Sequence, residues 1–504
     1  MNIKRAKQEI KDTIAAYLMK DEFGNYAIPA IRQRPMLLIG PPGVGKTQIM
    51  EQISQECQIA LVSYTITHHT RQSAIGLPFI ERKTYGGREY AVTEYTMSEI
   101  VAAIYNKIEQ TGMPEGVLFI DEINCVSETL APTMLQFLQG KSFGNHKIPE
   151  GWIIVAAGNP PEYNKSVREF DIVTLDRIRS IQVEPDFDAW KEYAQQAGVH
   201  PAICSYLNVR RQHFCRIETT VDGKLFATPR GWEDLSQLIE VYEKLGQKID
   251  RDVVMEYIQF PKIAKDFANY LELYYKYQND YQVEEILAGS IPQGALDKLE
   301  RAPFDERISV VSLLLSGLHE QFRNVCRTEE MLELRMRKLR ELHEGEGDTA
   351  AESVLQMFAS MLESFQQERV QKQESGLLSR IELRQILTVT AMLEEDLHAL
   401  RGAGPADAEA AWEFLRERFA ADSDRYEELL DTAGGMLEHA FDFMEAAFAG
   451  SQEMVLFVTE LNTGFYSVRF LQEYECERYY QYNKNLLFSD EEQELETLLK
   501  GERL

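Results

Sequence analysis

Apolar residues follow two patterns along the chain, and the change from one to the other falls near residue 185. Before that point, short continuous apolar runs alternate with segments whose apolar residues recur at helical spacing. The four runs are Met36–Ile39, Ile59–Val62, Val117–Ile120 and Trp152–Ala157. A short continuous run is typical of a strand that is buried on both faces. The alternation therefore predicts a parallel sheet covered by helices on both sides.

From Pro185 onward the apolar spacing is helical almost everywhere, and residues 2–20 form one further amphipathic helical pattern. A chain of 504 residues exceeds the roughly 250 to 300 residues that one hydrophobic core supports, so several domains are expected. Polar stretches that contain Gly or Pro predict loops at 344–349 and 401–407. The predicted fold class is α/β followed by all-α. Its domains are an α/β domain at 1–185, a small helical domain at 186–285 and a helical C-terminal region at 286–504.

A glycine-rich segment lies directly after the first apolar run and before a helical pattern. Its residues are Gly40, Pro41, Pro42, Gly43, Val44, Gly45, Lys46 and Thr47. They match GxxxxGK[ST], in which glycines let backbone N–H groups turn toward phosphates and the following helix N-terminus adds partial positive charge. A chance glycine turn would rarely have this context. We therefore expect these eight residues to bind ATP, with Lys46 at the β and γ phosphates and Thr47 binding Mg²⁺ through its hydroxyl.

Two acidic residues, Asp121 and Glu122, follow the third apolar run. A strand that ends here delivers its carboxylates to the edge of the sheet where the phosphate loop lies. Alone, such a pair would often be a strand end followed by solvated charges, but the upstream phosphate loop favours a catalytic role. We expect Asp121 to bind Mg²⁺ and Glu122 to polarise the water that attacks ATP.

The fourth apolar run leads to Gly158 and Asn159, and two prolines then prevent the strand from continuing. The Asn159 amide is expected to lie next to Glu122 and to orient the attacking water. The alternative is a plain turn asparagine. The three strand ends together are the arrangement called Walker A, Walker B and sensor 1, and they resemble the AAA+ superfamily over roughly residues 1 to 280.

Arg177 extends this resemblance to the MoxR-like branch of AAA+ proteins. Within Leu175-Asp176-Arg177-Ile178 it looks like the arginine finger, which reaches a neighbouring subunit's nucleotide and stabilises the transferring phosphate. The alternatives are a surface ion pair of Arg177, or a finger at Arg179 or Arg168 instead. The resemblance implies that the chain assembles with itself into a ring, expected to be hexameric.

Arg230 follows Thr228 and Pro229, a capping residue and a first-turn proline that mark a helix start. A cation in the first helical turn opposes the helix dipole and is stabilised by an anionic partner. The position resembles sensor 2 of the MoxR-like family, which implies contact with ATP phosphate. The alternative is an ion pair with Glu233 or Asp234.

Two hairpins are predicted at Tyr85-Gly86-Gly87-Arg88 and at residues 142–146. In the MoxR-like branch both line the axial face of the ring and touch substrates, although packing at subunit contacts is equally compatible with them. The resemblance implies an ATP-dependent, chaperone-like machine that remodels or matures partner proteins. A protein with a von Willebrand A type domain is the partner that it suggests.

The charge and cysteine patterns limit the other possibilities. The net charge is −28, and about three quarters of this excess lies after residue 290. This disfavours a nucleic-acid motor, the first rival function, because phosphate backbones attract clustered Lys and Arg. The second rival is a slow, nucleotide-gated binding switch. Scattered cysteines, a charged first helix and the absence of a long apolar stretch predict a reduced cytoplasmic protein without a signal peptide or membrane insertion.

Overall fold

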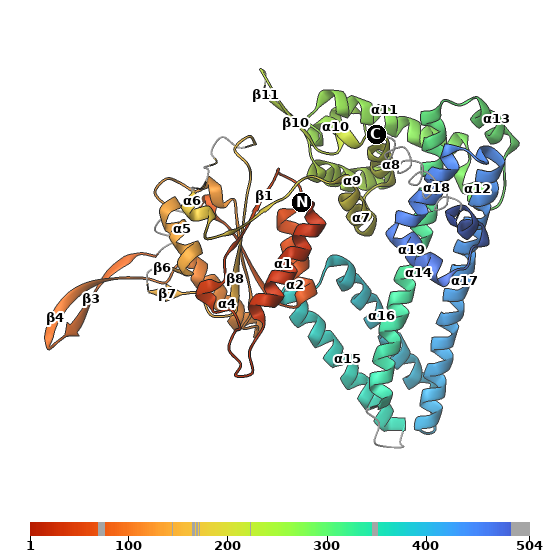
Figure 1. Cartoon of the computed structure of the whole chain (residues 1–504). Helices are drawn as coiled ribbons and strands as arrows, with labels where there is room; N and C mark the ends of the chain where they lie inside the picture. The colour runs from red at the N-terminus through yellow and green to blue at the C-terminus, as the bar shows by residue number, and fades with distance from the viewer. Residues whose placement is uncertain are drawn as a thin grey trace, which may run out of the picture. The chain divides into compact units, whose positions relative to one another are not determined.

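The computed structural model describes residues 1–68, 76–143, 145–163, 167, 170, 172–221, 223–344 and 351–484. Contacts divide the chain into two compact units (Figure 1). The first consists of Met1–Ala189, Thr228–Arg230 and Gln366–Arg384, and the second of Trp190–Ala227, Gly231–Phe365 and Gln385–Leu504. The domain boundaries at residues 185 and 285 remain predictions.

A five-stranded parallel sheet forms the centre of the first unit, in the order β2-β5-β8-β1-β9. The strands are β1 (Met36–Ile39), β2 (Ala60–Thr65), β5 (Gly116–Asp121), β8 (Trp152–Gly158) and β9 (Arg179–Gln182). The three inner strands, β5, β8 and β1, are the ones whose ends carry the predicted chemistry. Since parallel strands share their carboxyl edge, this order brings the three ends together.

Helices cover both faces of this sheet. They are α1 (Ile3–Leu18), α2 (Lys46–Cys57), α4 (Glu99–Thr111), α5 (Ala131–Gly140) and the short α6 (Ile172–Leu175). Val117 and Phe119 of β5 pack in the core that α1 and α2 cover, whereas Leu118 and Ile120 pack in the core of α4 and α5. Figure 1 shows these two helix pairs on opposite sides of the sheet. The predicted α/β architecture with a doubly covered parallel sheet is confirmed.

The strand β9 was not predicted from the sequence. It lies at the edge of the sheet beside β1, and its burial pattern includes one buried residue, Ile181. A run of Arg, Ser, Ile and Gln has no continuous apolar character, so the apolar pattern gives no sign of it. Tertiary pairing with β1 therefore creates this strand.

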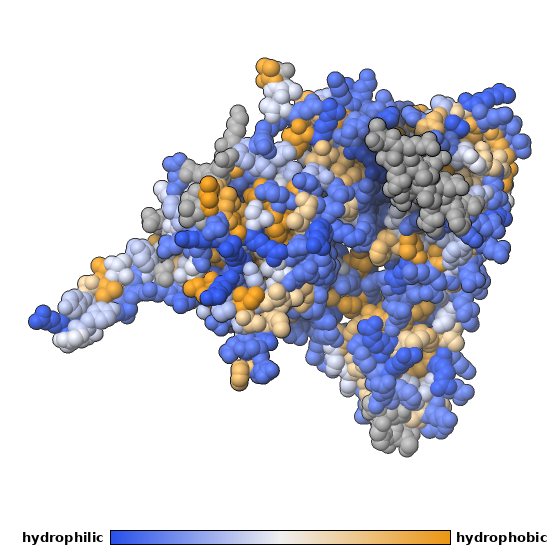
Figure 2. Space-filling model, viewed as in Figure 1, coloured by the Kyte–Doolittle hydropathy of each residue, from blue (hydrophilic) through white to orange (hydrophobic). Residues whose placement is uncertain are grey.

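Two antiparallel hairpins accompany the sheet of the first unit. β3 (Pro78–Tyr85) pairs with β4 (Arg88–Tyr95), and β6 (Ser142–Phe143) pairs with β7 (His146–Lys147). Gly86 and Gly87 have φ of +58° and +79°, as the predicted tight turn requires. Gly144, within the second predicted hairpin, lies outside the described residues. The space-filling view shows mostly hydrophilic colour along the projecting β3–β4 hairpin, with a small hydrophobic patch on it (Figure 2).

The second unit is almost entirely helical, which confirms the all-α prediction for the rest of the chain. Its one hairpin within the described residues joins β10 (Arg216–Thr220) and β11 (Gly223–Ala227). Four of its helices, α7, α9, α15 and α16, cross the boundary between the units. Its helices are α7 (Phe187–Ala197), α8 (Pro201–Val209), α9 (Pro229–Leu245), α10 (Arg251–Tyr257), α11 (Pro261–Asp280), α12 (Val283–Leu287), α13 (Gln293–Arg301), α14 (Phe304–Glu344), α15 (Ala351–Glu374), α16 (Arg380–Ala403), α17 (Ala408–Phe448), α18 (Gln452–Thr463) and α19 (Phe465–Glu473).

A closed triangle of polar side chains joins α7, α8 and α18. The Lys191 ammonium donates to Asn208 Oδ1 over 3.1 Å and forms an ion pair with Glu460. Asn208 Nδ2 in turn donates to Glu460 Oε1 over 3.1 Å. The Lys191 and Glu460 side chains are each 11% exposed. Because a nearly buried charge needs its partner, these three groups fix the two early helices against α18.

A second polar cluster lies inside the bundle of α14, α16 and α17. Arg335 donates through Nε to Asp396 Oδ2 over 3.0 Å and through Nη1 to Asp422. Asp396 also accepts from Arg418 Nε over 2.8 Å. The Arg335 and Asp396 side chains are each only 1% exposed. Because a buried charge that loses its partner destabilises the fold, this cluster should favour the helix register that keeps these groups paired.

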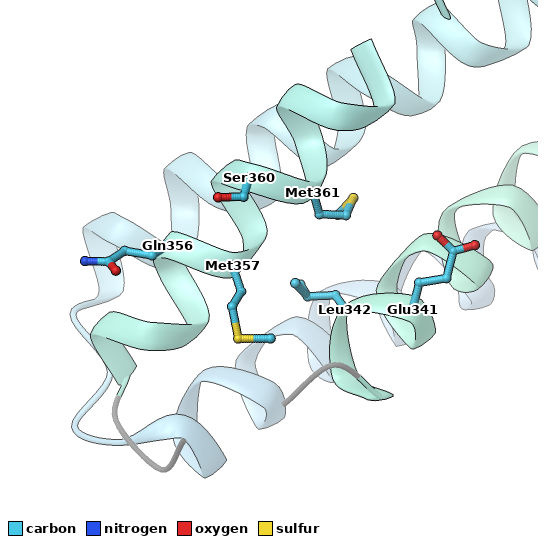
Figure 3. Close-up of a pocket in the computed structure, with 6 residues that line it drawn as sticks. All are labelled: Glu341, Leu342, Gln356, Met357, Ser360 and Met361. Carbon is cyan, nitrogen blue, oxygen red and sulfur yellow. The ribbon is translucent and has the colours of Figure 1, made fainter. Parts of the chain in front are cut away.

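A hollow of about 440 Å³ lies between the end of α14 and the start of α15. Figure 3 shows Leu342 and Met357 pointing toward each other there, whereas Gln356 and Ser360 point away. Its wall is thus mainly apolar and lacks the converging polar groups of a nucleotide site. Among the described helices, none has the length and apolar content needed to cross a membrane.

Replacing Arg335 with Met should destabilise the second unit by about 3 kcal/mol or more, because Asp396 loses one of its charged partners in a buried site. A denaturant titration of the purified chain measures this loss. Arg425→Met is the matched control: that arginine also donates to Asp422, but its side chain is 77% exposed. The control should cost less than about 1 kcal/mol. Equal losses in the two variants would contradict the role given to the buried cluster.

Candidate active site

The phosphate loop leaves β1 at a point where there is no room for a side chain. A Cβ on Gly40 would lie 2.5 Å from the backbone oxygen of Val183, so only glycine fits beside β9. Gly43 and Gly45 have φ of +77° and +88°, in the left-handed region that glycine adopts without strain. The helix α2 then begins at Lys46 with Gly45 as its N-cap. Residues 40–47 thus form a turn that ends on a helix N-terminus, which is suited to bind an anion.

Lys46 lies inside this turn and is only 8% exposed. Its Nζ donates to Gly40 O and Pro41 O, each over 2.8 Å, and to Asn159 Oδ1 over 3.0 Å. Burial lowers the pKa of this ammonium to about 8, and the charge of Arg230 adds to that effect while Asp121 opposes it. Within the described residues, the lysine is therefore a cation without a directly bonded anion. An incoming phosphate would supply one.

Thr47 and Asp121 meet at the edge of the sheet. Thr47 Oγ1, on the first turn of α2, donates to Asp121 Oδ2 over 2.9 Å. A hydroxyl and a carboxylate at hydrogen-bond distance offer two oxygen ligands on one side, which is the type of ligand that Mg²⁺ prefers. These residues therefore fit the predicted Mg²⁺ ion and would supply oxygen ligands to it.

Glu122 follows Asp121 in an unusual backbone conformation. Its φ of +55° places a non-glycine residue in the left-handed region. Its own N–H donates to Asp121 Oδ1 over 2.9 Å, which holds the turn. Such conformations carry strain and are found disproportionately at functional sites. Glu122 lies at the end of an inner strand and is partly exposed, as a residue that contacts a bound water must be.

Asn159 lies at the end of β8, next to β5, where its side chain accepts the hydrogen bond from Lys46. A further residue, Asn124, was not predicted from the sequence. Its Nδ2 donates to Asn159 O over 2.8 Å from the short 3-10 helix η3 (Ile123–Cys125). Nothing in the local pattern distinguishes Asn124 from a turn asparagine. Only the adjacency of β5 and β8 reveals this contact.

The first turn of α9 packs against the phosphate loop. A Cβ on Gly43 would lie 3.2 Å from Thr228 Cβ and 3.3 Å from Arg230 Cβ. Arg230 is exposed, and it forms no ion pair within the part of the chain that the structure describes. Neither Glu233 nor Asp234 therefore neutralises it. The structure therefore brings the start of α9, with Arg230, to the phosphate loop.

The candidate finger arginines have different surroundings. Arg177, after α6, is exposed and donates to Gln139 Oε1 of α5. Arg179 instead binds Glu9 and Thr13 of α1. Arg168 lies outside the described residues. None of the described contacts of Arg177 involves its own phosphate loop, so the structure does not bring it to the other site residues of the same chain.

Comparison with known proteins shows which family part of the first unit resembles. Residues 36–175 match the family model described as AAA, ATPase family associated with various cellular activities. A search of curated proteins gave no significant match. Two mutants of RuvB from Thermotoga maritima are similar solved structures, at 16% and 17% identity, each covering 51% of this chain and 69% of the other with a TM-score of 0.29. A Cytophaga hutchinsonii protein assigned as an ATPase is 15% identical over 36% of this chain and 51% of its own, with a TM-score of 0.21. The match to the AAA family model extends from β1 to α6.

The lowered pKa of Lys46 predicts a pH-dependent affinity for nucleotide. The free lysine loses its proton near pH 8, whereas bound phosphates favour the ammonium, so binding above this pH requires proton uptake. Affinity should therefore fall by about tenfold between roughly pH 7 and pH 9. Equilibrium titration with a fluorescent ATP analogue measures it. Lys46→Arg keeps its charge throughout and should bind more weakly but without this slope. A flat wild-type profile would contradict the assignment.

Proposed function

We propose that this chain hydrolyses ATP in a MoxR-like AAA+ ring and uses the energy to remodel or mature other proteins. The observation that carries the proposal is one connected set of hydrogen bonds at the carboxyl edge of the sheet. Lys46 contacts Asn159 and Thr47 contacts Asp121, so groups from β1, β5 and β8 converge there. The AAA match over residues 36–175 supports the same reaction.

Each group has a distinct part in this chemistry. Lys46 would exchange its bonds to Gly40 O and Pro41 O for the terminal phosphates of ATP, gaining an anionic partner. Thr47 and Asp121 would hold Mg²⁺, which neutralises charge that develops on the phosphates. Glu122 would accept a proton from the attacking water, and Asn159, released by Lys46, would orient that water. Arg230 would stabilise charge on the phosphates from the other side of the loop.

A ring would complete the site. Arg177 is exposed and makes no described contact with its own loop, as expected for a residue that acts on a neighbouring subunit's ATP. Arg179 is a weaker candidate, because the guanidinium is already bound by Glu9 and Thr13. A ring with this geometry hydrolyses ATP only where two subunits meet.

The β3–β4 hairpin is the proposed contact with a client. Its exposed apolar residues include Phe79 and Ile80, and Asn145 of the neighbouring hairpin donates to Glu94 at its base. The net charge of −28 favours a protein client over nucleic acid, because the chain would repel a phosphate backbone. A partner with a von Willebrand A type domain rests on the family resemblance alone.

Glu122→Gln should keep nucleotide binding and lose turnover by a factor on the order of 10², because the amide cannot accept the proton of the attacking water. Phosphate release and nucleotide affinity are measured on the same preparation. Cys57→Ser, at a partly buried position on the far end of α2, is the control and should retain turnover. Normal hydrolysis in Glu122→Gln would place the base elsewhere. Very slow turnover in the wild type would favour a nucleotide-gated switch.

Mixing of subunits tests the role of Arg177 in the ring. Arg177→Ala and Lys46→Ala should each be inactive alone, whereas mixed rings should regain activity where an intact loop meets an intact finger. Light scattering verifies that rings form, and phosphate release reports activity. Arg179→Ala should keep turnover, because its contacts are to α1 of the same chain. Mixed rings that stay inactive, or normal hydrolysis by Arg177→Ala, would contradict the trans-acting role.

A further inference from the structure

Asn124 is buried beside the proposed catalytic groups, and the structure gives it one specific hydrogen bond. The residue is 4% exposed, and its Nδ2 donates to the backbone oxygen of Asn159 over 2.8 Å. It lies two residues after Glu122, on the short helix that the left-handed Glu122 backbone begins. Cys125 N donates to Glu122 O over 2.8 Å and closes this turn. Asn124 therefore connects the turn of the proposed base with the end of β8.

The neighbouring glycine shows how closely the amide fits. A Cβ on Gly158 would lie 2.4 Å from Asn124 Oδ1 and 2.7 Å from its Cγ, so any larger residue at 158 would displace the amide. The orientation of the amide is also fixed by chemistry. If the group were turned over, its oxygen would face the carbonyl oxygen of Asn159, and two acceptors would repel each other.

The other end of the amide has an unused acceptor. Asn124 Oδ1 is buried and has no hydrogen-bond partner within the part of the chain that the structure describes. A buried acceptor without a partner costs free energy. The fold thus keeps the contact between Asn124 and Asn159 although the unpaired oxygen destabilises it locally. A residue that only filled space would not be expected to carry such an unpaired group.

We infer that Asn124 is a positioning residue for hydrolysis, an inference that rests on the ATPase function proposed above. It holds the main chain of Asn159 at a fixed place relative to the Glu122 turn. The Asn159 side chain and the Glu122 carboxylate then face one water from two strands at a constant separation. Asn124 itself touches neither nucleotide nor water, and it acts through Asn159. Reaction rates depend steeply on such placement, since a displacement near 1 Å can cost on the order of 10² in rate.

Two substitutions separate this role from a purely structural one. Asn124→Ala removes the donor, and Asn124→Asp keeps the shape while replacing the donor with an oxygen that repels Asn159 O. Both should lower kcat by about tenfold or more and change the dissociation constant of an ATP analogue by less than about twofold. Asn279→Ala is the matched control, because Asn279 also donates from Nδ2 to a backbone oxygen, that of Tyr275, on the exposed face of α11.

A double-mutant cycle gives the decisive readout. If Asn124 acts through Asn159, Asn124→Ala should cause no further loss of kcat in an Asn159→Ala background. The inference would be overturned if the loss of kcat in the double variant equalled the product of the two single losses. It would also be overturned if both Asn124 variants kept the wild-type kcat. If the Asn124 variants lost nucleotide affinity and also melted at a lower temperature, the residue would have a structural role instead, and the inference would be overturned. A wild-type chain that binds ATP without hydrolysing it would instead refute the proposed function.

Discussion

A lysine ammonium held against backbone carbonyls is the interaction on which the candidate site depends. Lys46 binds Gly40 O and Pro41 O and so keeps the loop closed around a nearly buried positive charge. Its third bond, to Asn159, reaches the next strand of the sheet. This bond is possible because β8 lies directly between β5 and β1. The strand order and this buried cation together bring groups from β1, β5 and β8 to one place.

The central part of this arrangement could be predicted from local patterns. The strand before Asp121 is a continuous apolar run, and the phosphate loop combines a strand, three glycines and a helix in a fixed spacing. Both signals arise from burial on two faces and from the backbone geometry that phosphate requires, so neighbouring residues suffice to show them. The proximity of Asp121 to Thr47 followed from the rule that parallel strands share one edge.

Other parts depend on contacts that no local pattern contains. The edge strand β9 has one buried apolar residue and forms only because β1 provides a partner. Asn124 resembles any turn asparagine until β5 and β8 are placed side by side. The long helices α14 and α17 were predicted as helical. The pairing of Arg335 with Asp396 and Asp422 was not predicted. Both partners lie more than 60 residues further along the chain, and helical spacing identifies a buried face without identifying its partner.

The triangle of Lys191, Asn208 and Glu460 has a mechanical consequence. Any rotation of α7 and α8 that left α18 behind would strip two charged groups of their partners in surroundings with little access to water. We therefore expect α7, α8 and α18 to move together, although α18 lies far from the other two in the sequence. A displacement of Lys191 would therefore also displace Glu460, which couples α7 to α18 in the acidic C-terminal region.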